Sequence, residues 1–190
     1  MPPAKPINPQ HLTPIELAQG LALIRAAPRD IGVLHQITYR PAVGARTSPT
    51  VATLTPAQGL VGDNWQDRLC KHTPDGGPDP LRQITLMGAR AVALIARQPE
   101  RWALAGDQLF VDLDLSAENL PPGTCLQIGS AVLEINGIPH TGCKKFAERF
   151  GVAALKFFNN PAGKALRLRG IHAQVVVAGE VRVGDKVTRA

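Results

Sequence analysis

The segment TCLQIGSAVLEING, residues 124–137, constrains the possible folds more than any other part of the chain. Its apolar residues alternate with other residues on both sides of Gly129 and Ser130, and this pattern predicts two short strands joined by a tight turn. Similar alternation recurs in IGVLHQITYRP (31–41), TVATLT (50–55), LRQITLM (81–87), QLFVDLDL (108–115) and IHAQVVVAGEVRVGDKVT (171–188). We interpret the last of these as a strand, a turn and a final strand.

These segments predict about seven or eight short strands. Helices are inserted between only some of them, whereas a parallel doubly wound sheet requires regular alternation of strands and helices. We therefore predict a mainly β, β-rich α+β fold, namely a mostly antiparallel barrel or strongly bent sheet with peripheral helices. The turn-rich, charged segment 58–80 is predicted to be a long loop, and loops of this length are usually functional or mobile.

Three segments have the apolar period of a helix, beginning with TPIELAQGLALIRAAPRD, residues 13–30. We predict Thr13 as its N-cap, Pro14 at its first position, Glu16 completing a capping box and Pro28 ending it. The other two are GARAVALIARQPE (88–100) and CKKFAERFGVAALKFFNN (143–160). The glycine in the last segment, Gly151, is predicted to break that helix. Because the first helix precedes every strand, we predict a helical appendage over residues 1–29 and a barrel domain over residues 30–190.

The sequence carries no signal for a membrane or an oxidising compartment. No apolar run approaches the ~20 residues of a membrane-spanning helix, and the first residues lack the apolar core of a secretory signal. The three cysteines, Cys70, Cys125 and Cys143, are odd in number and far apart, which argues against a disulfide framework. The sequence gives no four-ligand pattern for zinc, although zinc stays open. We therefore expect a cytoplasmic protein with no membrane partner.

The basic excess of the chain lies in its last fifty residues. Residues 141–190 contain ten Lys or Arg and three acidic residues, whereas residues 1–140 contain eleven and twelve. A patch of this sign attracts an anion, such as phosphate, sulfate, a nucleotide or nucleic acid. The nearby phenylalanines have the spacing of a helix core rather than of base-stacking platforms, which argues against nucleic acid. A solvated basic face remains the simplest alternative.

The segment IPHTGCKKFAERFG, residues 138–151, places Cys143 where a turn becomes a helix. A helix start and the adjacent Lys144 and Lys145 both stabilise a thiolate, which is the form that attacks electrophiles and binds metals. His140 could orient the thiol or carry a proton, or it could simply satisfy the turn. The alternative for Cys143 is a small buried apolar residue.

Other candidates carry weaker signals. Arg82 and Arg169 could each bind phosphate through two parallel hydrogen bonds, or they could be surface residues. Cys70 is interpreted as an exposed loop thiol and Cys125 as a structural strand residue. The histidines His35, His72 and His172 follow no spacing pattern, so we interpret them as structural or solvent-facing.

The chain resembles the MOSC family, named for the C-terminal domain of molybdenum cofactor sulfurase, from about Gly32 to Val187. The matching motifs are GLVGDNW with Asp63, RQITLM with Arg82, GDQL where the family has GENL, the hairpin from Leu120 to Ile135, PHTGC with Cys143, and VRVGDKV. The hairpin followed by the cysteine turn is the most specific part. Within that turn, His140 replaces an arginine and Gly142 replaces a proline of the usual family pattern.

This resemblance implies a barrel of the pyruvate-kinase-barrel-like type with chemistry at the cysteine. In the amidoxime-reducing relatives that cysteine binds molybdenum held on a pterin, molybdopterin. The resemblance therefore implies Cys143 as metal ligand and Cys143 and His140 as catalytic residues. For the anionic cofactor, the candidate binding residues are Asp63, Arg82, Lys144, Lys145 and Arg169.

Three functions remain open at this stage. The first is a molybdenum-cofactor-dependent oxidoreductase that reduces N-hydroxylated compounds, with an external reductase because the chain has no flavin or iron–sulfur motif. The second is a carrier of sulfur as a persulfide on Cys143, or a cofactor-binding module without turnover. It would need a separate cysteine desulfurase, because the chain has no lysine motif for pyridoxal phosphate. The third is a protein that binds an anion or nucleic acid through its basic third.

Overall fold

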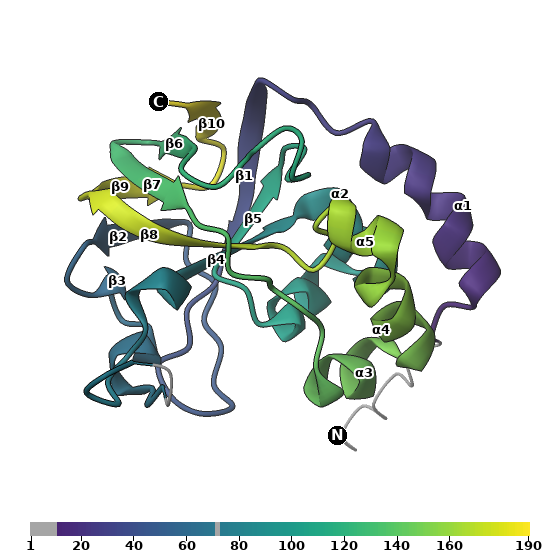
Figure 1. The fold of residues 1–190 in the computed structure, drawn as a ribbon, viewed down its shortest axis with the longest axis horizontal. Helices are drawn as coiled ribbons and strands as arrows, with labels where there is room; N and C mark the ends of the chain where they lie inside the picture. Colours follow the sequence, from purple (N-terminus) through teal and green to yellow (C-terminus); the bar gives the residue numbers. More distant parts are fainter. Residues whose placement is uncertain (1–10, 71–72) are drawn as a thin grey trace, which may run out of the picture.

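The computed structural model describes residues 11–70 and 73–190, and its centre is a closed barrel of seven strands (Figure 1). Around the barrel the strands follow the order β1-β10-β6-β7-β8-β4-β5. Their bounds are Ile31–Ile37 (β1), Ile84–Gly88 (β4), Leu109–Asp112 (β5), Cys125–Ile128 (β6), Ala131–Ile135 (β7), Ile171–Val177 (β8) and Lys186–Arg189 (β10). Only β4 and β5 pair in parallel. The predicted mainly β, mostly antiparallel barrel is confirmed.

A second sheet of three short strands lies beside the barrel, in the order β3-β2-β9. It contains β2 (Val51–Thr55), β3 (Gly59–Leu60) and β9 (Gly179–Arg182). The prediction of one final strand is therefore wrong, because β9 pairs with β2 whereas β10 pairs with β1 and β6. The chain changes sheets at a turn in which Gly184 has φ +97° and the Arg182 amide donates to the Asp185 carboxylate.

The barrel interior is filled by the alternating apolar residues that the sequence pattern identified. In β7, Ala131, Leu133 and Ile135 are buried, while the residues between them are half-buried. The same cluster includes Leu86 from β4 and Leu109 from β5, both fully buried. Since burying one such side chain contributes about 1.5–3 kcal/mol, this alternation fixes which face of each strand points inward.

The helices gather on one side of the barrel (Figure 1). They are α1 (Pro14–Arg25), α2 (Ala89–Ala96), α3 (Lys144–Phe150), α4 (Val152–Asn159) and α5 (Pro161–Ala165). The chain also forms the 3-10 turns η1 (Asn64–Asp67), η2 (Pro80–Arg82) and η3 (Pro99–Ala105). A second apolar core joins them to outward-facing Met87 and Phe110 of the barrel. The predicted break at Gly151 is confirmed, with φ +94°, whereas α5 was not predicted.

The N-terminal helix begins as the sequence predicted. The Thr13 hydroxyl accepts a hydrogen bond from the Glu16 amide, and the Glu16 carboxylate accepts one from the Thr13 amide. Helix α1 packs on α2 and α4, with Leu17 fully buried. Residues 1–10 of the predicted appendage lie outside the described residues, so its boundaries stay a prediction.

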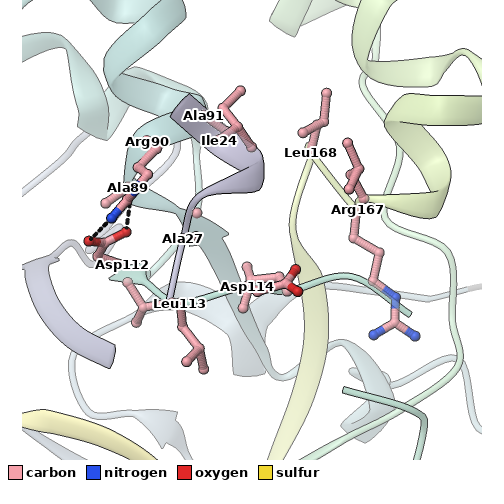
Figure 2. Close-up of a pocket in the computed structure, with 14 residues that line it drawn as sticks. Ile24, Ala27, Ala89, Arg90, Ala91, Asp112, Leu113, Asp114, Arg167 and Leu168 are labelled. Carbon is pink, nitrogen blue, oxygen red and sulfur yellow. Dashed lines mark hydrogen bonds and ion pairs between the residues drawn. The ribbon is translucent and has the colours of Figure 1, made fainter. Parts of the chain in front are cut away.

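A small cavity of about 20 Å³ lies between the end of α1 and the barrel. Figure 2 shows Arg90 of α2 joined to Asp112 of β5 at one side of this cavity, through two hydrogen bonds of 2.7 and 3.1 Å. A volume of this size holds about one water molecule, so it is a packing gap rather than a ligand site. Among the described residues, no helix is long and apolar enough to cross a membrane.

The predicted long loop, residues 58–80, is irregular for most of its described length but contains β3 and η1. Gly62 turns the chain with φ +89°, and the Asp63 amide donates to the Leu60 carbonyl. Trp65 is buried, and its indole N–H donates to the Asp79 carbonyl at 3.2 Å. These contacts hold the loop against the barrel, where it forms one wall of the largest cavity.

Candidate functional site

The largest cavity, of about 890 Å³, is bounded by segments that are distant in the sequence. One wall comes from residues 40–46, which follow β1, and from residues 64–70 of the long loop. The opposite wall comes from the turn 139–143 and from α3. The remaining lining residues are Asp79, Arg82, Thr85, Ala105, Gly106, Arg169 and His172. A volume of this size is typical of sites for small molecules and cofactors.

Most of the candidate residues from the sequence meet in this cavity. Cys143, His140, Lys145, Arg82 and Arg169 all line it. Two candidates do not. Lys144 is exposed outside the cavity, and the Asp63 side chain is fully buried behind the cavity wall.

Cys143 is the N-cap residue of α3, so the predicted helix start at the cysteine is confirmed. The residue is exposed, which excludes the alternative of a small buried packing residue. The turn before it is held by Asn159, whose side-chain oxygen accepts from the Gly142 amide at 3.0 Å and whose amide donates to the Gly142 carbonyl at 3.2 Å. A proline at position 142 would lack the amide hydrogen that donates to Asn159, and its side chain would displace the end of the Leu155 side chain.

Asp63 holds Arg40 rather than facing a ligand. Its carboxylate accepts from Arg40 Nε and Nη2, both at 2.8 Å, and from the Arg40 backbone amide at 2.9 Å. Arg40 Nη1 also donates to the Gly106 carbonyl at 3.1 Å. Paired arginine–carboxylate bonds of this kind fix both groups, so Asp63 positions Arg40 at the cavity wall.

The cavity is strongly cationic, because seven of its lining residues are Arg or Lys and only two are Asp. Within residues 11–70 and 73–190, four of these cations have no carboxylate partner: Arg46, Arg68, Lys145 and Arg149. Backbone carbonyls hold two of them, since Arg46 Nε donates to Ala103 at 3.2 Å and Arg149 Nη1 to Leu104 at 2.6 Å.

These cations repel one another. Burial, followed by the charges of Arg149 and Arg40, lowers the pKa of the Arg46 guanidinium. Burial, followed by the Arg40 charge, likewise lowers the pKa of Arg68. Both groups keep their charge near neutral pH, so an anion that enters the cavity relieves this repulsion.

Two histidines lie together at the cavity wall, with the rings of His140 and His172 4.5 Å apart between centroids. Burial lowers the pKa of His140 well below its usual value, and the nearby Arg169 adds to the effect. Burial lowers the pKa of His172 to about 4, with Arg82 and Arg169 as further causes. Both imidazoles are therefore neutral near pH 7, and the His140 contact with Asp107 joins a neutral ring to a carboxylate.

The buried Asp107 anchors Arg169 behind the two rings. Its Oδ2 accepts from Arg169 Nη1 at 2.6 Å, while Arg169 Nη2 donates to the Ala105 carbonyl at 2.9 Å. Burial raises the pKa of Asp107, and the charge of Arg169 opposes that rise. Arg169 also lies over the Phe146 ring, 5.2 Å from its centroid, so it is fixed from both sides.

Sequence reasoning missed several lining residues. The sequence indicated a structural or solvent-facing His172, yet this residue lines the cavity beside His140. Cys70 is half-buried and lines the same cavity as Cys143, whereas Cys125 on β6 does not. Arg40, Arg46 and Arg68 lie in the part of the chain with a slight acidic excess, so no charge count could single them out.

The described residues place no group of three or more His, Cys, Asp or Glu where it could hold a metal ion. A metal at Cys143 would therefore need further ligands from a bound molecule. A second cavity, of about 320 Å³, is also lined by the 136–141 segment and shares Pro139, His140, Thr141 and Arg169 with the first.

Comparison with known proteins places these observations in a family. The MOSC domain family model matches residues 80–188, a range that includes β4 to β9, most of β10 and Cys143. No curated protein matches the chain.

Two solved structures have the same fold. The YuaD protein from Bacillus subtilis has a TM-score of 0.62 and 17% identity, covering 83% of this chain and 94% of that one. YiiM from Escherichia coli has a TM-score of 0.53 and 19% identity, covering 83% and 69%. At this level of identity the likeness concerns the fold alone.

Proposed function

This chain belongs to the MOSC domain family, and from that premise we propose that its large cavity binds the molybdenum cofactor, with Cys143 as a ligand of the metal. One observation carries the proposal: an exposed cysteine thiol lines the same cavity as four cations that have no carboxylate partner among the residues that the structure describes. Molybdopterin presents both a metal and a phosphate, and this combination matches a thiolate beside guanidinium groups.

The residues of the cavity fit such a ligand. A thiolate is a soft, anionic group that binds metals. Guanidinium groups bind phosphate through paired hydrogen bonds, and their planar donors suit its oxygens better than a lysine does. We therefore assign the phosphate to Arg46, Arg68 and Arg149, with Lys145 beside them.

The buried aspartates have a different role. Asp63 and Asp107 each hold an arginine, Arg40 and Arg169, in a fixed orientation. In this proposal they are positioning residues, because they prepare the cavity wall without touching the ligand. Arg82 is tied to Asp79 at 3.0 Å and contributes charge at the edge, whereas Lys144 contributes from outside.

We further propose that the loaded protein reduces N-hydroxylated compounds. When bound, the cofactor would supply two-electron chemistry at its metal. Conversion of an N–OH group to N–H releases water and consumes two electrons and two protons, so the electrons must come from an external reductase. Within the chain, neutral His140 lines the cavity beside Cys143 and is suited to carry a proton to the leaving oxygen.

Molybdenum and pterin content test the cofactor proposal. The protein is made in a host that synthesises the cofactor, and we expect both in near-equal amounts with the wild-type chain. Cys143→Ala should lose most of the molybdenum. Cys125→Ala serves as the matched control, because Cys125 lies on β6 outside the cavity. Molybdenum at background in the wild type, or equal amounts in wild type and Cys143→Ala, would overturn the proposal.

A persulfide carrier is the second candidate, favoured by the exposure of Cys143 beside cations that would stabilise a persulfide anion. A cysteine desulfurase would pass its terminal sulfur to the Cys143 thiolate, leaving its own cysteine as the thiolate. Mass spectrometry after incubation with such an enzyme should then find one added sulfur atom on Cys143. The concave arrangement of the cations supports a small anion over nucleic acid, which would favour an open basic face.

A further inference from the structure

Four buried polar atoms without a hydrogen-bond partner gather at the cavity wall: His140 Nδ1, His172 Nδ1, Asp107 Oδ1 and Arg169 Nε. Among the described residues only one other buried side-chain atom, Arg101 Nε, is in this position. Unpartnered buried polar atoms are uncommon in native proteins and indicate either a functional role or a missing ligand. Because four such atoms lie together, this part of the wall has the features of a ligand-binding site.

The geometry connects these atoms into one cluster. Asp107 uses Oδ2 to accept from Arg169, while its free Oδ1 lies 3.5 Å from His140 Nδ1. The two imidazole rings are 4.5 Å apart and tilted by 41°. The cluster can therefore accept hydrogen-bonding partners and a proton without any change of the backbone.

Burial and the charges around the two rings disfavour a proton on either imidazole. His140 faces Arg40 from the end of β1, Arg82 from η2, Arg169 from the segment before β8, and Asp107 from the segment before β5. His172 faces Arg82, Arg169 and Asp79. Each of these three arginines is itself paired with a carboxylate: Arg40 with Asp63, Arg82 with Asp79 and Arg169 with Asp107.

We propose that this cluster is a proton-linked anion site, which binds a doubly charged anion and takes up one proton on the His140–His172 pair as it does so. The anion offsets the surrounding cations and makes an imidazolium favourable. An imidazolium at His140 donates from Nδ1 to the free oxygen of Asp107 and from Nε2 toward the anion. Two imidazolium rings at this separation repel each other, so the pair takes up one proton and not two.

The inference goes beyond the cofactor proposal, because it requires only an anion of this charge. It also identifies His172 and Asp107 as functional residues, which neither the sequence pattern nor the metal-binding role of Cys143 required. The anionic ligand and the proton would bind together. A reaction in the cavity would therefore have a protonated histidine beside it.

Sulfate is the suitable probe, because it keeps both charges between about pH 5.5 and 8, where histidines titrate. Calorimetry of sulfate binding in two buffers with different heats of ionisation gives the number of protons taken up. We expect about one proton at the acidic end of this range, with binding up to roughly tenfold tighter for each unit of pH lowered. Absence of sulfate binding, or binding without proton uptake, would overturn the inference.

Variants assign the proton to the pair. His172→Asn and His140→Asn should each reduce the proton uptake, and His35→Asn should leave it unchanged, because His35 is exposed on β1 and contacts Trp102 outside the cavity. Uptake that persists in both cavity variants contradicts the assignment. If both variants fail to fold, the wild-type proton number still decides. Because no cofactor enters the experiment, its failure is distinct from a failure to find molybdenum.

Discussion

Replacing Asp63 by Asn tests whether the cavity wall depends on a buried ion pair. The Asp63 side chain is fully buried and the Arg40 side chain is 11% exposed, so the pair is shielded from solvent. The carboxylate accepts three hydrogen bonds from Arg40, two of them from the guanidinium. Asn offers one acceptor oxygen and turns an NH₂ group toward a cation. The change leaves an uncompensated buried charge, which costs about 3–5 kcal/mol.

The assay is urea unfolding monitored by circular dichroism. For a chain of this length, each kcal/mol also lowers the melting temperature by about 2–4 °C, so a shift of roughly 6–20 °C should accompany the loss. Glu118→Gln is the matched control, because the Arg29–Glu118 pair has a similar distance, 2.9 Å, but the Glu118 side chain is 81% exposed. That control should cost under about 1 kcal/mol. If Asp63→Asn costs no more than the control, Asp63 does not hold Arg40 as described.

Three further predictions follow from single contacts. Gly170→Ala should destabilise the protein by about 2–5 kcal/mol in urea unfolding, because φ is +103° and a Cβ would press on the Leu86 carbonyl. Gly123→Ala is the control and should cost less, because φ is +88° there but no atom lies near the position of the added Cβ. His172→Asn should weaken the acid sensitivity of folding. The pKa of His172 falls from 6.5 in the unfolded chain to about 4 when folded, so its contribution is complete above pH 6.5 and is lost toward pH 4, by up to roughly 3 kcal/mol. Cys143 should react with iodoacetamide faster than the other cysteines, which are half-buried, and peptide mapping checks this order.

The barrel strands could be predicted because the pattern that identifies each strand lies within a few neighbouring residues. Strand β7 alternates buried and half-buried residues over five positions, and the hairpin that joins it to β6 needs only a two-residue turn. The split of the last segment into β9 and β10 could not be predicted in the same way. The alternation continues on both sides of the Gly184 turn, and only the partners, β2 for one strand and β1 for the other, separate them.

The site residues that lie together in one short motif could be predicted from the sequence. Those that only the folded chain brings together could not. Cys143, with His140 three residues before it, stands in one short segment that also carries the helix start. Arg46 and Arg149 are about a hundred residues apart in sequence, and only Arg149 lies in the basic last fifty residues. They meet because the loop after β1 and helix α3 line the same cavity, which depends on the closure of the barrel.

The most direct test of the account is X-ray absorption at the molybdenum edge, which counts the sulfur neighbours of the metal in the loaded protein. Wild-type protein and Cys143→Ser would be loaded with cofactor and compared at equal molybdenum content. If the Cys143 thiolate binds the metal, the serine variant has one sulfur neighbour fewer. An unchanged sulfur count in Cys143→Ser would contradict the central claim, because the cysteine would then lie in the cavity without binding the metal.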